Sequence, residues 1–85
     1  MSFARLAFNS NGARPLSALA PGTRGTVVAV ASHQTDRVER LMSLGVTLGA
    51  PVTLLQLFPS VVLRCDQTEL VVERVVADII LVRIE

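Results

Sequence analysis

The sequence contains no lysine, tryptophan or tyrosine, and it has one cysteine and one histidine among 85 residues. A single cysteine cannot form an intrachain disulfide, and one cysteine with one histidine cannot supply a four-ligand zinc site of the Cys/His type. No apolar run approaches the ~20 residues that a membrane-spanning helix needs. The composition therefore predicts a protein without disulfides or a membrane span, and it fits a reducing, cytoplasmic setting.

Charge is also scarce. Charged residues make up 18% of the chain and the net charge is +1, so there is no concentrated positive charge for nucleic acid or an anionic membrane. Aromatic residues are 4% of the chain, which leaves few side chains on which RNA bases could stack. The sequence therefore argues against a nucleic-acid-binding protein.

The chain is long enough for one small domain and too short for a two-domain enzyme. Hydrophobic residues make up 51% of it. Residues 1–14 differ from the rest because they end in the turn-forming run Asn9 to Gly12. We interpret residues 1–14 as an N-terminal extension and residues 15–85 as the domain. The extension carries Phe3 and Phe8, which predicts that it folds back or docks on a partner.

The β-rich runs predict strands over residues 26–31, 52–58, 61–65, 70–72 and 79–84, with short helical turns at 16–19 and 73–77. The runs at 52–58 and 61–65 predict a hairpin. The fold class expected from this order is mainly β: a small closed barrel of about five strands with one inserted short α-helix.

The inserted helix is predicted over residues 36–44. Asp36 is the expected N-cap with Glu39 three residues later, and Gly45 follows the last helical residue. An apolar stripe on this helix consists of Val38, Leu41 and Met42. Arg37 and Arg40 are expected on the opposite side, where they pair with the helix carboxylates or contact a partner.

Two predicted strands are apolar on both faces. Leu55 and Leu57 lie opposite the core side of one strand, and Ile79 and Leu81 lie opposite the core side of another. A domain of this size cannot hide both faces of its sheet. We expect this second face to be covered by the N-terminal segment, by a second copy of the chain in a homo-oligomer, or by another protein.

Few residues could carry chemistry. Cys65 alternates in phase with buried positions and is interpreted as a small core residue rather than a nucleophile paired with His33. His33, Asp36 and Glu39 are weak candidates for a divalent transition metal such as Fe²⁺, Mn²⁺ or Zn²⁺, although helix capping explains both carboxylates. The glycines of the segment Gly22 to Gly25 are interpreted as turn residues. We expect no catalytic residue and no required cofactor.

Three short motifs occur in order. They are L-x-x-L-x-P-G-x-x-G-x-V from Leu16 to Val27, R-L-x-x-L-G-x-x-x-G from Arg40 to Gly49, and A-x-x-I-x-V from Ala77 to Val82. In combination and spacing they resemble the ferrous iron transport protein A (FeoA) family over residues 15–84. The resemblance implies an SH3-like β-barrel that acts in the cytosol as an accessory to the FeoB-type membrane transporter, whose cytosolic part binds GTP.

Two functions follow as hypotheses. The first is a non-enzymatic adaptor that docks on the FeoB-type transporter, peripheral to the inner membrane, with Arg37, Arg40, Leu44 and Leu48 as contact candidates. The second is a metal-responsive SH3-like regulatory module that uses His33 with Asp36 or Glu39. The absence of tyrosine and tryptophan argues against a proline-recognising groove of the familiar SH3 kind.

Overall fold

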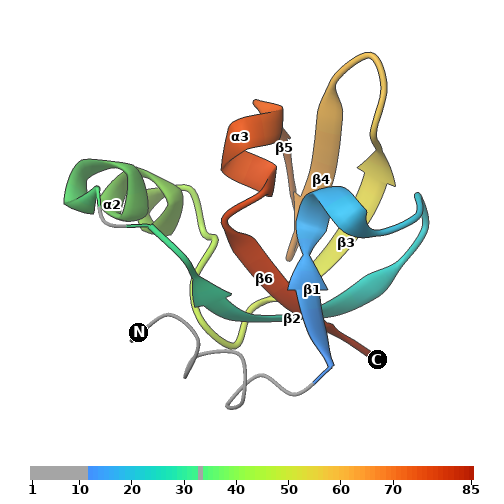
Figure 1. Ribbon diagram of the computed structural model, residues 1–85, viewed down its shortest axis with the longest axis horizontal. Helices are drawn as coiled ribbons and strands as arrows, with labels where there is room; N and C mark the ends of the chain where they lie inside the picture. The colour runs from blue at the N-terminus through green and yellow to red at the C-terminus, as the bar shows by residue number, and fades with distance from the viewer. Residues whose placement is uncertain (1–11, 33) are drawn as a thin grey trace.

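The computed structural model describes residues 12–32 and 34–85, and Figure 1 shows how the elements are arranged. Six strands, two α-helices and one 3-10 turn follow one another along these residues. In chain order they are β1 (Ala13–Pro15), η1 (Leu16–Ala18), β2 (Arg24–Val30), α2 (Thr35–Ser43), β3 (Pro51–Gln56), β4 (Val61–Cys65), β5 (Thr68–Val72), α3 (Arg74–Ala77) and β6 (Ile80–Ile84). The mainly β class, the single longer helix and the β3–β4 hairpin are confirmed.

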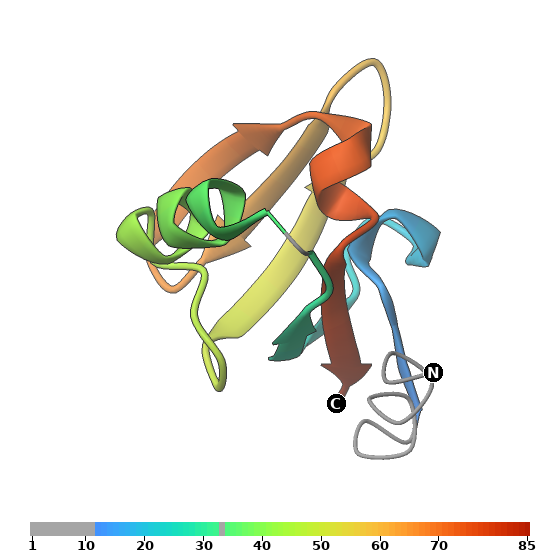
Figure 2. The same ribbon diagram turned by 60° about the vertical axis from the view of Figure 1, so that its left-hand side comes forward.

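The strands form one antiparallel sheet in the order β1-β6-β2-β3-β4-β5 (Figure 2). The expectation of a closed sheet is wrong for the described residues, because β1 pairs only with β6 and β5 pairs only with β4. The sixth strand, β1, lies across the expected border between residues 14 and 15. It adds an edge to β6 with Pro15 opposite Leu81.

Alternation along the strands builds the core. In β4 every second side chain is buried, and β3 and β6 each bury two alternate residues; these side chains meet Leu16 and Leu19 from the segment after β1. The buried set is Leu16, Leu19, Val27, Leu41, Val46, Val52, Leu54, Val61, Leu63, Cys65, Ala77, Ile80 and Val82. Burial of these apolar groups is the main stabilising term for a domain this small.

The glycines of the segment Gly22 to Gly25 have different roles. Gly22 adopts φ 94° in a turn, as predicted. Gly25 instead lies buried within β2, where a Cβ would stand 2.3 Å from the carbonyl oxygen of Arg83. The prediction of a turn residue is therefore wrong for Gly25. A glycine is needed at this position because β2 and β6 approach each other too closely to leave room for a side chain.

Helix α2 begins one residue before the expected start. Its N-cap is Gln34 without a capping side-chain hydrogen bond, so Asp36 lies inside the first turn and the N-cap prediction for it is wrong. The C-terminal prediction is confirmed: Gly45 has φ 100°, and its amide donates to the carbonyl of Met42 at 3.0 Å. The amide of Val46 donates to the carbonyl of Leu41 at 2.9 Å, which completes a Schellman motif.

The face expected to be open is partly covered. Leu55, Leu57, Ile79 and Leu81 are all half-buried, and Pro15 of β1 is paired opposite Leu81. The prediction is wrong for Leu57 and Ile79, because both pack against the core. The large apolar side chains that are exposed lie elsewhere in the described residues, chiefly Met42, Leu44, Leu48, Phe58, Val71, Val75 and Ile84. Phe3 and Phe8, expected to fold back, lie outside the described residues.

Candidate functional site: a groove between helix α2 and strand β5

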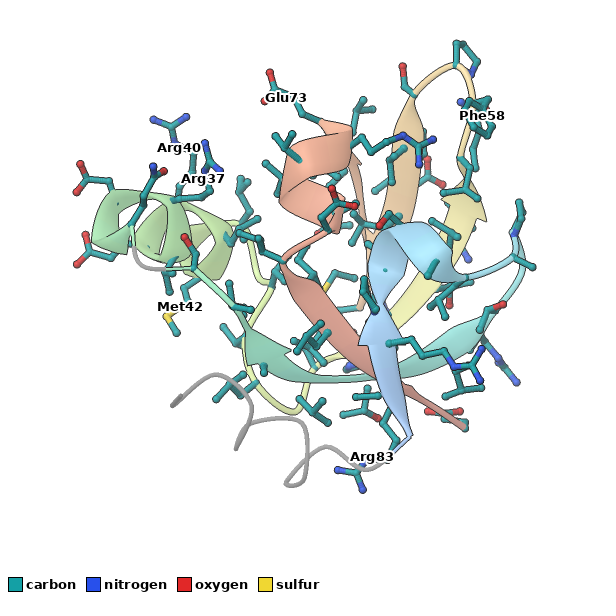
Figure 3. The ribbon with its side chains drawn as sticks, viewed as in Figure 1. Arg37, Arg40, Met42, Phe58, Glu73 and Arg83 are labelled. Carbon is teal, nitrogen blue, oxygen red and sulfur yellow. The ribbon has the colours of Figure 1, made fainter. Side chains whose placement is uncertain are left out.

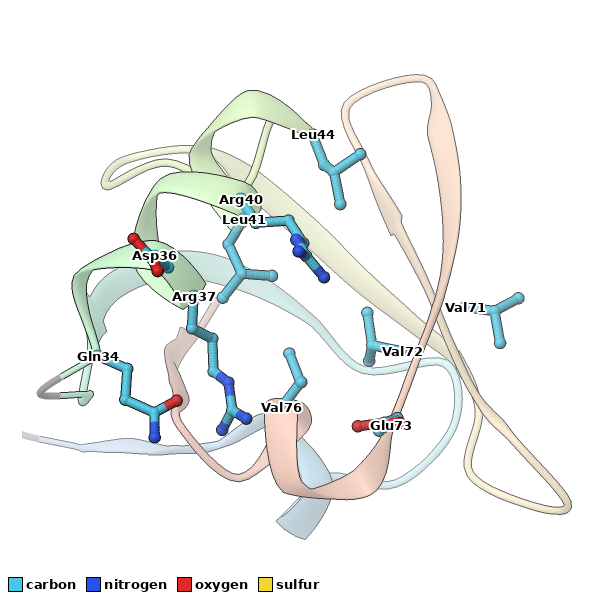
Figure 4. A pocket seen from close by; sticks show the side chains of 10 residues that line it. All are labelled: Gln34, Asp36, Arg37, Arg40, Leu41, Leu44, Val71, Val72, Glu73 and Val76. Carbon is cyan, nitrogen blue, oxygen red and sulfur yellow. The ribbon is translucent and has the colours of Figure 1, made fainter.

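A groove of about 410 Å³ separates α2 from the end of β5 and the start of α3, and we call it the α2 groove (Figure 4). Volumes of this order are usual for ligand sites in proteins. Its lining residues are Gln34, Asp36, Arg37, Arg40, Leu41, Leu44, Val71, Val72, Glu73 and Val76. The groove exists because α2 stands beside the sheet instead of packing flat on it (Figure 1).

The floor of the groove is apolar. It consists of Leu41 of α2, which is buried, and of Val72 and Val76, which are half-buried and reach the floor from the wall that faces α2. Leu44, at the end of α2, points into the groove and keeps 43% of its surface exposed. Exposed apolar surface in a concave site favours a partner that removes it from water.

The arginines of α2 lie on the groove side. Residues 37, 40, 41 and 44 follow the spacing that places side chains on one helix face. The prediction that Arg37 and Arg40 lie away from Leu41 is therefore wrong, because both arginines line the groove together with it. Met42 points to another side of the helix and is 44% exposed.

No carboxylate neutralises these arginines. All seven acidic residues of the chain belong to the described residues, and the only ion pair formed there joins Arg64 and Glu69 at 3.4 Å. Glu73 lies on the opposite wall of the groove (Figure 4), and neither Glu73 nor Asp36 forms an ion pair with Arg37 or Arg40. The α2 wall therefore presents two unpaired guanidinium groups above an apolar floor, an arrangement suited to an anionic group.

The four predicted contact residues separate into two sets. Arg37, Arg40 and Leu44 come together in the α2 groove, whereas Leu48 is 60% exposed in the loop between α2 and β3 and does not line it. Sequence reasoning missed the second wall, formed by Val71, Val72, Glu73 and Val76. The only sequence feature that could have indicated this wall is the run of valines across the junction between β5 and α3. Such a run is equally typical of buried core residues.

A second, smaller cleft of about 270 Å³ adjoins the α2 groove and shares Val71, Val72 and Glu73 with it. At its rim the guanidinium of Arg74 lies 4.6 Å from the centre of the Phe58 ring and donates to the carbonyl of Leu57 at 3.4 Å. This cation–π contact holds Arg74 against the Phe58 ring, although Phe58 is 72% exposed. Phe58 and Val71 extend the apolar surface beyond the groove.

Only two of the three metal candidates belong to the described residues. Asp36 and Glu39 are both exposed on α2, and His33 lies outside the described residues. Within residues 12–32 and 34–85, no three His, Cys, Asp or Glu side chains are placed to hold a metal ion.

Cys65 has the environment of a core residue. Its side chain is 2% exposed and its thiol donates to the carbonyl of Gly45 at 3.1 Å. Burial, with a smaller effect from Asp66, raises the pKa of the Cys65 thiol. Because the thiolate is the reactive form, this supports the interpretation of Cys65 as a structural residue.

Neither helix of the part of the chain that the structure describes has the length and apolarity needed to cross a bilayer.

The bent antiparallel sheet, with one helix between β2 and β3 and a groove beside that helix, defines a small SH3-like domain. The FeoA domain model matches residues 14–84, and the chain belongs to the FeoA family, which is associated with ferrous iron transport. No curated relative matches the chain.

Solved structures agree with this assignment. A crystal structure of an iron uptake regulatory protein (FeoA) is 25% identical, with a TM-score of 0.78 over 86% of this chain and 97% of that one. A solution structure of the FeoA protein from Chlorobium tepidum is 34% identical, with a TM-score of 0.74 over 82% of this chain and 69% of that one.

A third structure shares the fold at lower identity. It is the zinc complex of Stenotrophomonas maltophilia FeoA, described as a procaryotic SH3 domain protein, with 20% identity and a TM-score of 0.67 over 82% of this chain and 87% of that one. The SH3-like fold class inferred from the sequence is confirmed.

Proposed function

We propose that this protein is a non-enzymatic, cytoplasmic accessory protein of ferrous iron uptake that docks through the α2 groove on the cytosolic region of a FeoB-type transporter and modulates it. Family membership supports the link to ferrous iron transport. The observation that carries the docking site is the pair of unpaired arginines, Arg37 and Arg40, above the apolar floor of the groove. Such a surface combines apolar burial with charge-directed specificity.

A binding titration tests the proposal. The purified chain is titrated against the detergent-solubilised FeoB-type transporter of the same cell, with and without guanine nucleotide. Saturable binding whose affinity depends on the nucleotide is the expected result, since an adaptor that modulates the GTP cycle must bind its states differently. Absence of binding in every nucleotide state, with a transporter shown to hydrolyse GTP, would contradict the proposal.

A charge-reversal pair locates the docking site. Arg40→Glu is expected to weaken binding by about 2 kcal/mol or more, the range of a hot-spot residue. Arg83→Glu makes the same change of charge on an exposed residue of β6 at the far side of the molecule (Figure 3) and is expected to leave binding unchanged. Equal effects of the two variants would show a general charge effect and remove the α2 groove as the site.

The metal-responsive module is the second candidate. It is favoured by the zinc complex of the Stenotrophomonas maltophilia protein. Calorimetric titration with Fe²⁺, Mn²⁺ and Zn²⁺ should then give a stoichiometric site that His33→Ala abolishes. An unchanged stoichiometry in this variant would remove His33, Asp36 and Glu39 as the ligand set.

Self-association is tested separately. Light scattering over the micromolar range gives the mass of the chain in solution, and a dimer would supply a second copy as cover for the half-buried face around Leu55 and Leu81.

A further inference from the structure

Strand β5 is an edge of the sheet, and it borders the α2 groove. It pairs with β4 on one side, and none of the other described elements pairs with its second side. Val71 lines the groove although its side chain points away from α2 (Figure 4), which leaves the main chain of β5 at this wall. Open edges of this kind are templates for an added strand.

The register identifies the free backbone groups. Asp66 and Gln67 form the two-residue turn of the β4–β5 hairpin, and Asp66 has φ 61°. The residues that flank such a turn, Cys65 and Thr68, exchange hydrogen bonds, and hydrogen-bonded pairs then recur at every second position. The amide and carbonyl groups of Glu69 and Val71 therefore point away from β4.

These groups find no partner elsewhere. Among the described residues, no backbone hydrogen bond from another element reaches Glu69 or Val71. The side chain of Val71 is 71% exposed beside them. The edge is therefore both unsatisfied by the protein and flanked by apolar surface, which favours strand addition over simple solvation.

The opposite wall sets the chemistry of the occupant. Arg37 and Arg40 extend from α2 toward the groove without a carboxylate partner, and a planar guanidinium binds a carboxylate through paired hydrogen bonds. Glu73, on the β5 side, disfavours a second acidic group there. The groove thus favours a bound strand whose acidic side chain points toward α2 over one whose acidic side chain points toward Glu73.

Other occupants fit this chemistry less well. Residues 1–11 contain no aspartate or glutamate, so the chain's own N-terminal segment lacks the charge that the arginines require. A second copy would offer its own β5, whose one acidic residue, Glu69, is already paired with Arg64 at 3.4 Å. An extended acidic segment of a different protein can both pair with the open edge of β5 and supply the carboxylate that Arg37 and Arg40 require.

We propose that the α2 groove binds an extended peptide segment of a partner protein as an added strand on β5, with an acidic side chain of that segment held by Arg37 and Arg40. This deepens the docking function proposed above, and it rests on that function only for the identity of the partner. The main chain of β5 supplies the affinity and the arginines of α2 supply the selection for acid.

The probe is a phage-displayed library of random octapeptides, selected against the intact protein and followed by calorimetry on the synthesised winners. The winners are expected to share one acidic position next to β-branched residues. Arg37→Glu and Arg40→Glu should each weaken binding of these peptides about 30-fold, whereas Arg83→Glu should leave it unchanged. Winners without an acidic position, or binding that survives both reversals, overturn the proposal.

A backbone variant separates strand addition from other kinds of groove binding. Val71→Pro removes an outward amide without breaking the β4–β5 ladder, and Val71→Thr is the matched control that keeps it. The expected result is loss of peptide binding in Val71→Pro and retention in Val71→Thr, with both variants folded by circular dichroism. On the unmodified protein, the peptide should also slow hydrogen exchange at the amides of Glu69 and Val71. Unchanged exchange at both amides overturns strand addition even if Val71→Pro fails to fold.

The two proposals fail in different ways. Transporter binding that is lost in Arg40→Glu but retained in folded Val71→Pro leaves the docking function standing and overturns strand addition. Acidic peptides that require both the Val71 amide and Arg40, with no transporter bound in any state, support strand addition and overturn the proposed partner. A dimer that Val71→Pro dissociates would assign the edge to a second copy and overturn the present proposal.

Discussion

Gly25 of β2 lies so close to Arg83 of β6 that a Cβ on Gly25 would stand 2.3 Å from the Arg83 carbonyl oxygen and 2.6 Å from a methyl group of Val82. The first of these is backbone, so no rotamer change relieves the clash. The two strands also bring β1, which pairs with the other side of β6, into the same sheet. The absence of a side chain at residue 25 is thus a condition for the sheet order.

We therefore predict that Gly25→Ala destabilises the protein by about 3 kcal/mol, the upper range for a side chain forced into a packed core. For a domain of this length the melting temperature should fall by about 12 °C or more. Thermal unfolding followed by circular dichroism measures the change. The control is Thr26→Ala in the next, half-buried position of β2, which should cost much less.

A second prediction concerns the end of α2. Gly45→Ala places a Cβ in a left-handed conformation, at φ 100°, and should cost about 1–2 kcal/mol. The Schellman hydrogen bonds at this residue fix the direction in which α2 leaves the core, so the variant should also weaken docking at the groove. Ser43→Ala, on the last helical residue, keeps an ordinary backbone conformation and is the control for chemical denaturation.

The third prediction is a pH dependence from Cys65. The folded protein raises the pKa of this thiol, so above about pH 8.5, where the unfolded thiol ionises, the folded state binds more protons than the unfolded state. The stabilisation is fully present below that pH and is lost as the pH rises toward the folded pKa. Its slope reaches at most about 1.4 kcal/mol per pH unit.

Urea unfolding between pH 7 and 10 measures this slope. Cys65→Ala removes the thiol and should flatten the alkaline decline of the free energy of unfolding, although it lowers stability at every pH by creating a cavity. The same alkaline slope in both proteins would show that Cys65 is not its source.

The fourth prediction uses two residues at the end of α2 with nearly equal exposure, the C-cap Leu44 at 43% and Met42 at 44%. Leu44 lines the α2 groove and Met42 does not. Leu44→Asp should therefore abolish binding of the transporter or of acidic peptides, whereas Met42→Asp should leave it within a factor of two or so, the scale of a neutral surface change. Similar losses in both variants would show that the aspartate acts through the stability of α2.

The helix shows where sequence reasoning reached its limit. The position of Gly45 directly after the C-cap was predicted correctly, because that signal is local and steric, although the helix ends at Ser43 and not at residue 44. The start was set one residue too late, because Asp36 is a favoured cap by composition but Gln34 occupies the position. The side of the helix taken by Arg37 and Arg40 was assigned wrongly, since periodicity groups residues without stating which neighbour lies opposite.

The sequence alone determined the mainly β class, the positions of the inner strands, the burial of Cys65 and the FeoA family. These depend on alternation and on local turn chemistry, which neighbouring residues carry. Only the tertiary structure decided that Gly25 serves strand packing, that β1 joins the sheet and β5 leaves it open, and that Arg37 and Arg40 face Val72 and Glu73 across a groove. These features join residues more than 30 positions apart, and their distances are set by how the sheet bends, which no local pattern encodes.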